Sequence, residues 1–242
     1  MNEKNMKIEI WSDIACPFCY IGKTHFEKAL ADFEHKSKVE VVYKSYQLDP
    51  EYHHKEGDTS ISVLVEKKGM PEGQVRQMTG HVESMASQVG LSMDIQNTIP
   101  ANTLDSHRLI HFAITEKKEK ETIDALFHSH FTEAKNIEDK QVLTEVAKKV
   151  GLNQERTAEV LSSDEFGYDV SQDILESRNL GIRGVPFFLI NRKYAVSGAQ
   201  PMDAFRNALK QTFEEWQKEN EQIVSLNSAA DDGSSCSVDG CD

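Results

Sequence analysis

Two cysteines, Cys16 and Cys19, stand at the junction of a strand-like and a helix-like segment, and this arrangement narrows the choice of fold sharply. Residues 7–11, KIEIW, alternate polar and apolar side chains as a half-buried strand does. Residues 20–33 carry apolar side chains near helical spacing, and residues 39–46, VEVVYKSY, are β-branched and alternating. Strand, helix and strand in this order form a βαβ unit with a right-handed connection. The sequence therefore predicts an α/β fold with the cysteines where the first strand meets its helix.

The middle of the chain predicts a large all-helical insertion. Between residues 59 and 165, apolar residues recur at three- and four-residue intervals, and Gly151 stands where one helix should end. The α/β pattern then resumes, because residues 185–190 form an apolar run of strand length and residues 194–197 can pair with it. We therefore expect a discontinuous α/β domain of residues 1–58 and 166–222, a helical subdomain of residues 59–165, and a flexible tail of residues 223–242.

Charge and cysteine content exclude several classes of protein. The net charge of −13 would repel nucleic acid and anionic membranes. No apolar run reaches the roughly 18 residues of a membrane helix, and the amino-terminal residues lack the apolar core of a signal peptide. The four cysteines fall in two close pairs, too few for a secreted disulfide scaffold. We expect a cytoplasmic protein with no nucleic-acid or membrane partner, in which paired cysteines serve catalysis or metal binding.

The position of the first pair predicts redox chemistry. Cys16 would be the N-cap of the helix and Pro17 its first residue, where a missing N–H costs nothing. The unpaired N–H groups and the positive end of the helix dipole then favour the Cys16 thiolate. Cysteines in such places have pKa values of about 3.5–7.5 instead of about 8.5. We expect Cys16 to attack a disulfide and the more buried Cys19 to resolve the mixed disulfide.

A second element that supports this chemistry is Val185-Pro186 at the start of a predicted strand. Proline cannot donate to a sheet ladder, so its position there is unusual. A cis bond would turn the preceding backbone toward the thiols and leave its groups free for an extended substrate. An ordinary trans proline at a strand start is the alternative.

Three blocks of sequence resemble the FrnE-like branch of the DsbA family. They are ACPFCYIGK near the start, NTLDSHRL and LFHSHFTEAKNIED in the middle, and GIRGVPFFLINRKYAVSGAQP near the end. The resemblance extends to about Trp216 and implies a thioredoxin-like fold with a helical insertion, a cis Val185–Pro186 bond, and family roles for Cys16, Cys19 and Pro186. Pro17-Phe18 differs from the Pro-His of DsbA itself, which argues against strong oxidising power.

The second pair, Cys236 and Cys241, lies in the predicted tail, and some FrnE-like proteins resemble this chain in carrying such a pair. A bridge across so short a loop would stabilise the fold by only about 2 kcal/mol on the entropic model. We expect a second redox pair that shuttles electrons or regulates the first. An inert bridge and a zinc site formed with Cys16 and Cys19 stay open.

Other polar residues have less specific patterns. His107 and His111 stand four apart on one predicted helix, but without an evident carboxylate partner they are interpreted as solvated or core-edge histidines. Asp13 either relays protons from Cys19 or caps the turn before the helix. Phe18, between the cysteines, is the best candidate for an exposed apolar contact with substrate.

Together these patterns predict a thiol–disulfide oxidoreductase without cofactor or resident metal. Its partners would be protein disulfides and dithiols, together with low-molecular-weight thiols, and Val185, Pro186 and Phe18 would contact the substrate. One alternative is a glutathione-dependent isomerase or transferase of the kappa type, although such proteins usually carry serine in place of Cys16. The other alternative is a zinc-binding redox protein.

Overall fold

The computed structural model describes residues 5–230, and the side chains of residues 5–220. Four strands form one sheet in the order β2-β1-β3-β4. β1 pairs in parallel with β2, and β3 runs antiparallel to both β1 and β4. The strands are β1 (Met6–Ser12), β2 (Val39–Ser45), β3 (Phe187–Ile190) and β4 (Tyr194–Ser197).

The burial of β1 differs from the half-buried pattern that its sequence predicts. Glu9 and Trp11 are 1% and 0% exposed, so both faces of the strand are covered. The reason is position, because β1 lies between β2 and β3 in the sheet. Arg192, in the turn between β3 and β4, pairs with the Glu9 carboxylate and compensates its burial.

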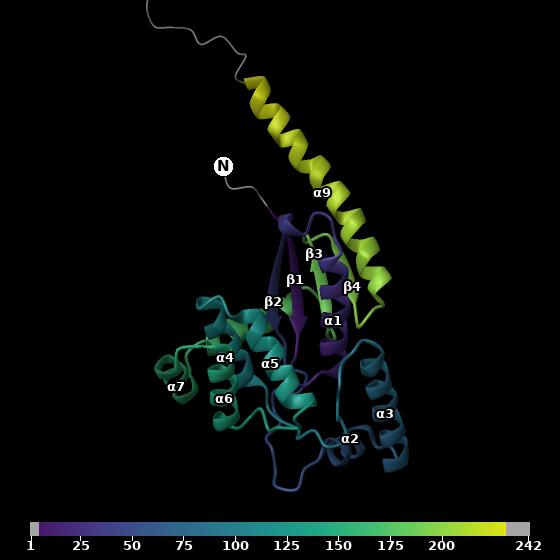
Figure 1. Ribbon diagram of the computed structural model, residues 1–242, viewed down its shortest axis with the longest axis vertical. Coiled ribbons are helices and arrows are strands. Elements are labelled where there is room, and N and C mark those ends of the chain that lie inside the picture. Colours follow the sequence, from purple (N-terminus) through teal and green to yellow (C-terminus); the bar gives the residue numbers. More distant parts are fainter. Residues whose placement is uncertain (1–4, 231–242) are drawn as a thin grey trace, which may run out of the picture.

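Helices cover the sheet and continue beyond it (Figure 1). α1 (Pro17–Ala31) packs against α9 (Met202–Ala230) beside the sheet, while α8 (Gly167–Asn179) packs against β2. α9 continues past the sheet and includes residues 223–230, which the sequence analysis assigns to the tail. Cys236 and Cys241 lie outside the described residues.

A group of helices follows β2 and lies near the end of the sheet where β1 stops and α1 starts (Figure 1). It comprises α2 (Ser60–Lys68), α3 (Glu72–Gln88), α4 (Leu104–Thr115), α5 (Glu119–Phe131), α6 (Lys140–Val150) and α7 (Gln154–Ser162). Between α1 and β2 there is also a short 3-10 turn, η1 (Lys36–Lys38). As the sequence predicts, Gly151 ends α6 in the left-handed conformation, with φ 79°.

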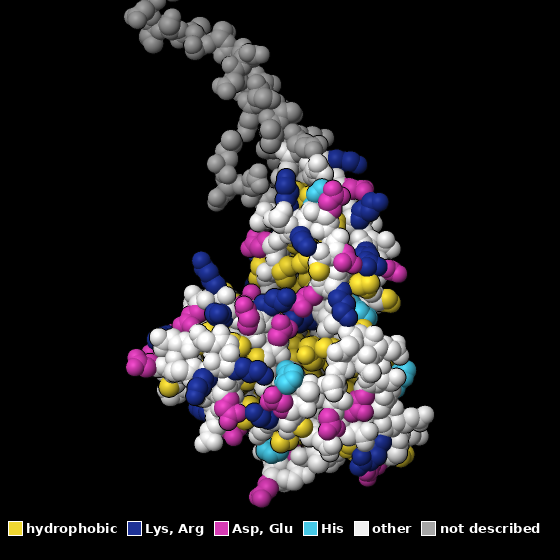
Figure 2. All heavy atoms as spheres, in the orientation of Figure 1, with side chains coloured by type: hydrophobic (Ala, Val, Ile, Leu, Met, Phe, Trp, Pro, Cys, Tyr) yellow, Lys and Arg dark blue, Asp and Glu magenta, His cyan; other side chains and the backbone are white. Residues whose placement is uncertain are grey.

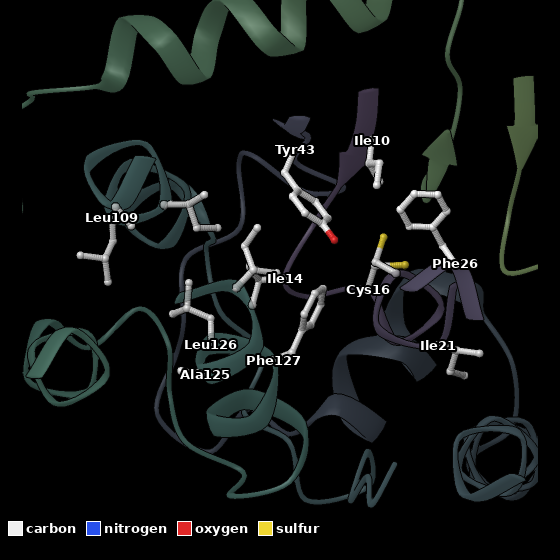
Figure 3. Close-up of a cluster of buried hydrophobic side chains, with 14 of the residues drawn as sticks. Ile10, Ile14, Cys16, Ile21, Phe26, Tyr43, Leu109, Ala125, Leu126 and Phe127 are labelled. Carbon is white, nitrogen blue, oxygen red and sulfur yellow. The ribbon is translucent and has the colours of Figure 1, made fainter. Parts of the chain in front are cut away.

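One apolar core joins the sheet to this helical group. Figure 3 shows Cys16 between side chains of both parts, with Phe26 of α1 on one side and Phe127 of α5 on the other. Tyr20 of α1 stacks on Phe127, with ring centroids 4.8 Å apart. The cysteines therefore lie at the junction of the two parts. Within residues 5–230, the structure contains no helix with the length and apolarity that crossing a membrane requires.

Candidate active site

Cys16 is the N-cap of α1 and Pro17 follows it in the first turn. The Cys16 backbone is extended, with φ −98° and ψ 111°, and its carbonyl oxygen accepts hydrogen bonds from Cys19 N at 3.0 Å and Tyr20 N at 3.4 Å. Its own N–H donates to Asp13 O at 3.1 Å, which closes the turn after β1. This local geometry places the Cys16 side chain at the positive end of the helix dipole.

Cys19 lies one turn further along α1 and is 1% exposed. Its sulfur accepts a hydrogen bond from Asp13 N, at 3.5 Å. Burial, followed by the neighbouring Cys16 sulfur, holds the pKa of Cys19 well above the usual range of a thiol. Cys19 therefore stays protonated until a group nearby removes its proton.

The loop before β3 completes the surroundings of Cys16. The Val185–Pro186 peptide bond is cis, and Cys16 Sγ donates to Val185 O at 3.7 Å. Gly198 N donates to Pro186 O at 2.8 Å, so the loop is tied to the end of β4. Phe18 is 39% exposed, a large fraction for a phenylalanine beside a buried pair.

Gly22 explains how this loop approaches α1 so closely. A Cβ atom at Gly22 would lie 2.9 Å from Pro186 Cγ and 3.3 Å from Ala199 Cα. Only a residue without a side chain leaves room for the proline loop at this position. Gly22 is not among the predicted site residues, although a glycine inside a helical pattern is a signal of close packing or function.

Asp13 is buried beneath the pair and accepts hydrogen bonds from Leu48 N at 2.7 Å and Ala15 N at 3.3 Å. Its Oδ1 lies 3.4 Å from His107 Nε2, and both side chains are almost fully buried. Burial favours the neutral acid, but His107 and the Leu48 N–H outweigh it and hold the pKa of Asp13 below its usual range. Asp13 is thus an ionised buried carboxylate that also fixes the turn before Cys16.

The interpretation of the two histidines needs correction. His107 is 2% exposed and faces Asp13, so it is not solvated. His111 lies 3.1 Å from Asp173 Oδ2, a residue of α8. Neither carboxylate partner is evident from residue spacing, because Asp13 and Asp173 are distant from α4 in the chain. No set of three or more histidine, cysteine or acidic side chains suited to hold a metal ion occurs in residues 5–230.

Figure 2 shows hydrophobic side chains gathered at the surface near the amino-terminal end of α1, between the sheet and the helical group. The arrangement thus combines a cysteine at a helix N-terminus, a buried partner thiol, a backbone carbonyl at a cis-proline loop that accepts from the first thiol, and apolar surroundings. Such a combination can exchange disulfides with an extended peptide segment.

Residues 7–210 match the family model described as the DSBA-like thioredoxin domain. The uncharacterized protein YwbO of Bacillus subtilis (strain 168) is 29% identical over 205 residues, which cover 84% of this chain and 94% of that protein.

Solved structures agree with the family model. The crystal structure of a probable DsbA oxidoreductase from Streptomyces coelicolor superposes with a TM-score of 0.82 at 38% identity, covering 87% of this chain and 91% of that one. The cytosolic disulfide reductase DsbM from Pseudomonas aeruginosa, also solved with GSH, is similar in fold, with a TM-score of 0.59 at 15% identity, covering 86% of this chain and 98% of that one.

These matches confirm the predicted thioredoxin-like α/β fold with its helical insertion and the predicted enzyme class. The narrower assignment to the FrnE-like branch stays a prediction. The chain belongs to the DSBA-like thioredoxin domain family, and it is a thiol–disulfide oxidoreductase.

Proposed function

We propose that Cys16 and Cys19 are the redox couple of this oxidoreductase and that protein disulfides or dithiols are its substrates. The observation that carries the proposal is the position of Cys16. Its sulfur lies at the N-terminus of α1 and 3.7 Å from the carbonyl oxygen of Val185. A substrate cysteine that reaches this sulfur can pair its backbone with the loop at Val185 and Pro186.

The two thiols have different surroundings, which supports different roles. Cys16 lies at the positive end of a helix dipole and is 4% exposed, whereas Cys19 is 1% exposed and its sulfur accepts a hydrogen bond from Asp13 N. Burial stabilises the neutral thiol of Cys19. Cys16 is therefore assigned the attack on substrate and Cys19 the resolving step.

The exchange proceeds in two steps. The Cys16 thiolate attacks one sulfur of the substrate disulfide, and the other substrate sulfur leaves as a thiolate and takes up a proton. Cys19 then loses its proton and attacks Cys16 Sγ, which forms the Cys16–Cys19 bond and releases the first substrate sulfur. The substrate gains two electrons and the couple loses two, and the reverse sequence oxidises a dithiol.

The proposed substrate class follows from the surroundings of Cys16. Phe18, with 39% of its surface exposed, offers an apolar contact, and Val185 offers a backbone acceptor. Both suit an extended peptide better than a charged small molecule. Low-molecular-weight thiols are included as partners that recycle the couple in the cytoplasm. A second dithiol role for Cys236 and Cys241 remains part of the proposal and concerns residues beyond those described.

Insulin reduction in the presence of dithiothreitol tests the proposal. The full chain should accelerate the reaction, and Cys16→Ser should abolish the acceleration because the attacking sulfur is lost. Cys19→Ser should accumulate a mixed disulfide on Cys16 that mass spectrometry detects. Activity that survives Cys16→Ser would reject the proposal. A parent chain that does not accelerate insulin reduction would favour the kappa-type or the zinc-binding alternative.

The direction of electron flow requires a separate measurement, that of the reduction potential of the Cys16–Cys19 couple. Thioredoxin and DsbA differ by about 150 mV in reduction potential, so the equilibrium of the Cys16–Cys19 couple with glutathione distinguishes reductase from oxidase.

A further inference from the structure

The loop at Val185 and Pro186 is held in place by a second loop. Gly198 N donates to Pro186 O at 2.8 Å, and Gly198 is the first of residues 198–201, which join β4 to α9. We call these residues the β4–α9 connection. It leads into α9, which packs against α1 (Figure 1). The position of the connection relative to α1 therefore helps to set where the backbone of Val185 lies beside Cys16.

One side chain of α1 forms a hydrogen bond with this connection. His25 Nδ1 lies 2.7 Å from Gln200 O, and because a carbonyl oxygen only accepts, the imidazole is the donor. His25 follows Gly22 by three residues, so both lie on the same face of α1. Gly22 leaves room on that face for Pro186 and Ala199. The face of α1 that admits the proline loop thus also binds the connection.

The connection has short hydrogen bonds of its own. Gln200 N donates to Gly198 O at 2.9 Å, and Gln200 Nε2 donates to Ser197 O at 3.0 Å. A displacement of the Gln200 carbonyl would therefore move Gly198, whose N–H is the donor to Pro186 O. A continuous series of hydrogen bonds joins the His25 imidazole to the loop at Pro186.

Packing fixes the elements on either side of the connection. Phe205 of α9 is 1% exposed, and its ring lies 4.7 Å from that of Phe188 in β3, centroid to centroid. Gln200 and Pro201 are exposed, so they bury little apolar surface. The position of the connection between the packed elements therefore depends on hydrogen bonds, and His25 supplies a bond from α1.

We propose, on the basis of the function proposed above, that His25 is a positioning residue for polypeptide substrates. Its hydrogen bond holds the β4–α9 connection against α1, and the connection holds the backbone of Val185 and Pro186 where an extended polypeptide can pair with it. A small disulfide has no such backbone and needs only the Cys16 sulfur. His25 therefore acts on the binding of a polypeptide and not on the exchange of sulfur atoms.

Kinetics with a polypeptide and with a small disulfide test the proposal together. In the insulin assay with dithiothreitol, His25→Ala should raise KM about fivefold, the effect of one lost hydrogen bond, and leave kcat within about twofold of the parent. Reduced protein is also mixed with dithiobis(nitrobenzoate), and oxidation of the peptide that contains Cys16 and Cys19 is followed by quenching, alkylation and mass spectrometry. His25→Ala should be oxidised at the parent rate.

Two further readouts separate positioning from a general loss of stability. His25→Asn offers an amide donor close to the position of the imidazole Nδ1 and should restore the parent KM. The amide of Gly198 reports on the loop directly, because its hydrogen exchange depends on its bond to Pro186 O. This amide should exchange faster in His25→Ala and at about the parent rate in His25→Asn. His81→Ala, at an exposed histidine of α3, is the matched control and should leave KM and exchange unchanged.

The outcomes are distinct. A parent KM for insulin in folded His25→Ala overturns the role of His25 and leaves the couple intact. Equal increases of KM in His25→Ala and His25→Asn also overturn it, because the second variant keeps the donor. Slower oxidation of His25→Ala by dithiobis(nitrobenzoate) does the same, since it shows a disturbed couple. A parent chain that reacts with dithiobis(nitrobenzoate) at Cys16 but does not reduce insulin rejects the proposed substrate class and this role with it.

The circular dichroism spectrum of each variant shows whether it folds. If His25→Ala does not fold, His25→Phe takes its place with the same expected results, because it keeps a ring at this position and removes the donor.

Discussion

The absence of one side chain on α1 allows the loop at Val185 and Pro186 to lie close to this helix and to Cys16. Gly22 of α1 faces Pro186 and Ala199, and a Cβ atom there would contact both at 2.9 and 3.3 Å. The Ala199 contact is with backbone, which cannot rotate away. We expect Gly22→Ala to displace the proline loop from Cys16 and to lower the rate of insulin reduction severalfold.

The stability of Gly22→Ala should also decrease. Overpacking costs about 1–3 kcal/mol, which exceeds the gain of about 1 kcal/mol from replacing glycine in a helix. Chemical denaturation measures this change in the free energy of unfolding. Gly80→Ala in α3 is the control, since a Cβ atom there meets nothing within 4 Å, and it should stabilise the protein and leave activity unchanged. Full activity in Gly22→Ala would show that the proline loop need not be close to α1.

Among the elements, β2, α4 and α8 are held together by one buried carboxylate. Asp173 Oδ2 accepts a hydrogen bond from Ser45 N at 3.0 Å and lies 3.1 Å from His111 Nε2, while Lys44 Nζ lies 2.8 Å from Oδ1. Burial opposes the charge, but His111 and Lys44 outweigh it and hold the pKa of Asp173 below its usual range. The carboxylate therefore contributes stability above the usual Asp pKa, and this contribution is lost as the pH falls through the lowered value.

Asp173→Ala should destabilise the protein by about 3 kcal/mol, because the substitution leaves Lys44 and the Ser45 N–H without their partner. Urea unfolding at neutral pH measures the loss, and the difference from the parent should narrow at acidic pH. Asp169→Ala, an exposed position on the same helix, should change stability by less than about 1 kcal/mol. Equal effects of the two substitutions would contradict a role for Asp173 in joining the elements.

At the scale of the whole molecule, the sheet and the helical group share one core. Leu126 of α5 is fully buried in the same cluster as Ile10 of β1 and Phe26 of α1. Leu126→Ala should destabilise by about 3 kcal/mol. Trp11 and Trp216 both lie in the α/β part, so their fluorescence reports that part alone.

We expect the fluorescence and far-ultraviolet circular dichroism transitions of Leu126→Ala to move together to lower denaturant, because a shared core unfolds cooperatively. Leu104→Ala, 40% exposed on α4, should leave both transitions near those of the parent. A shift in circular dichroism without a shift in fluorescence would show that the helical group unfolds by itself.

Much of the candidate site was predictable because it depends on neighbours in the chain. The N-cap position of Cys16, Pro17 in the first turn and the burial of Cys19 one turn later follow from helix geometry over four residues. The strand before the pair and the apolar run after Pro186 were likewise visible in local periodicity.

The sequence by itself therefore determined the strand–cysteine–helix unit, the helical insertion and the nature of the attacking group, since capping, periodicity and dipole effects act within a few residues. Only the tertiary structure decided that Glu9 is buried in a central strand, that Pro186 packs against Gly22, and that the side chain of His107 lies beside that of Asp13. Those contacts join residues far apart in the chain, and they depend on how complete elements pack, because side chains from separate elements become neighbours only when the shared core forms.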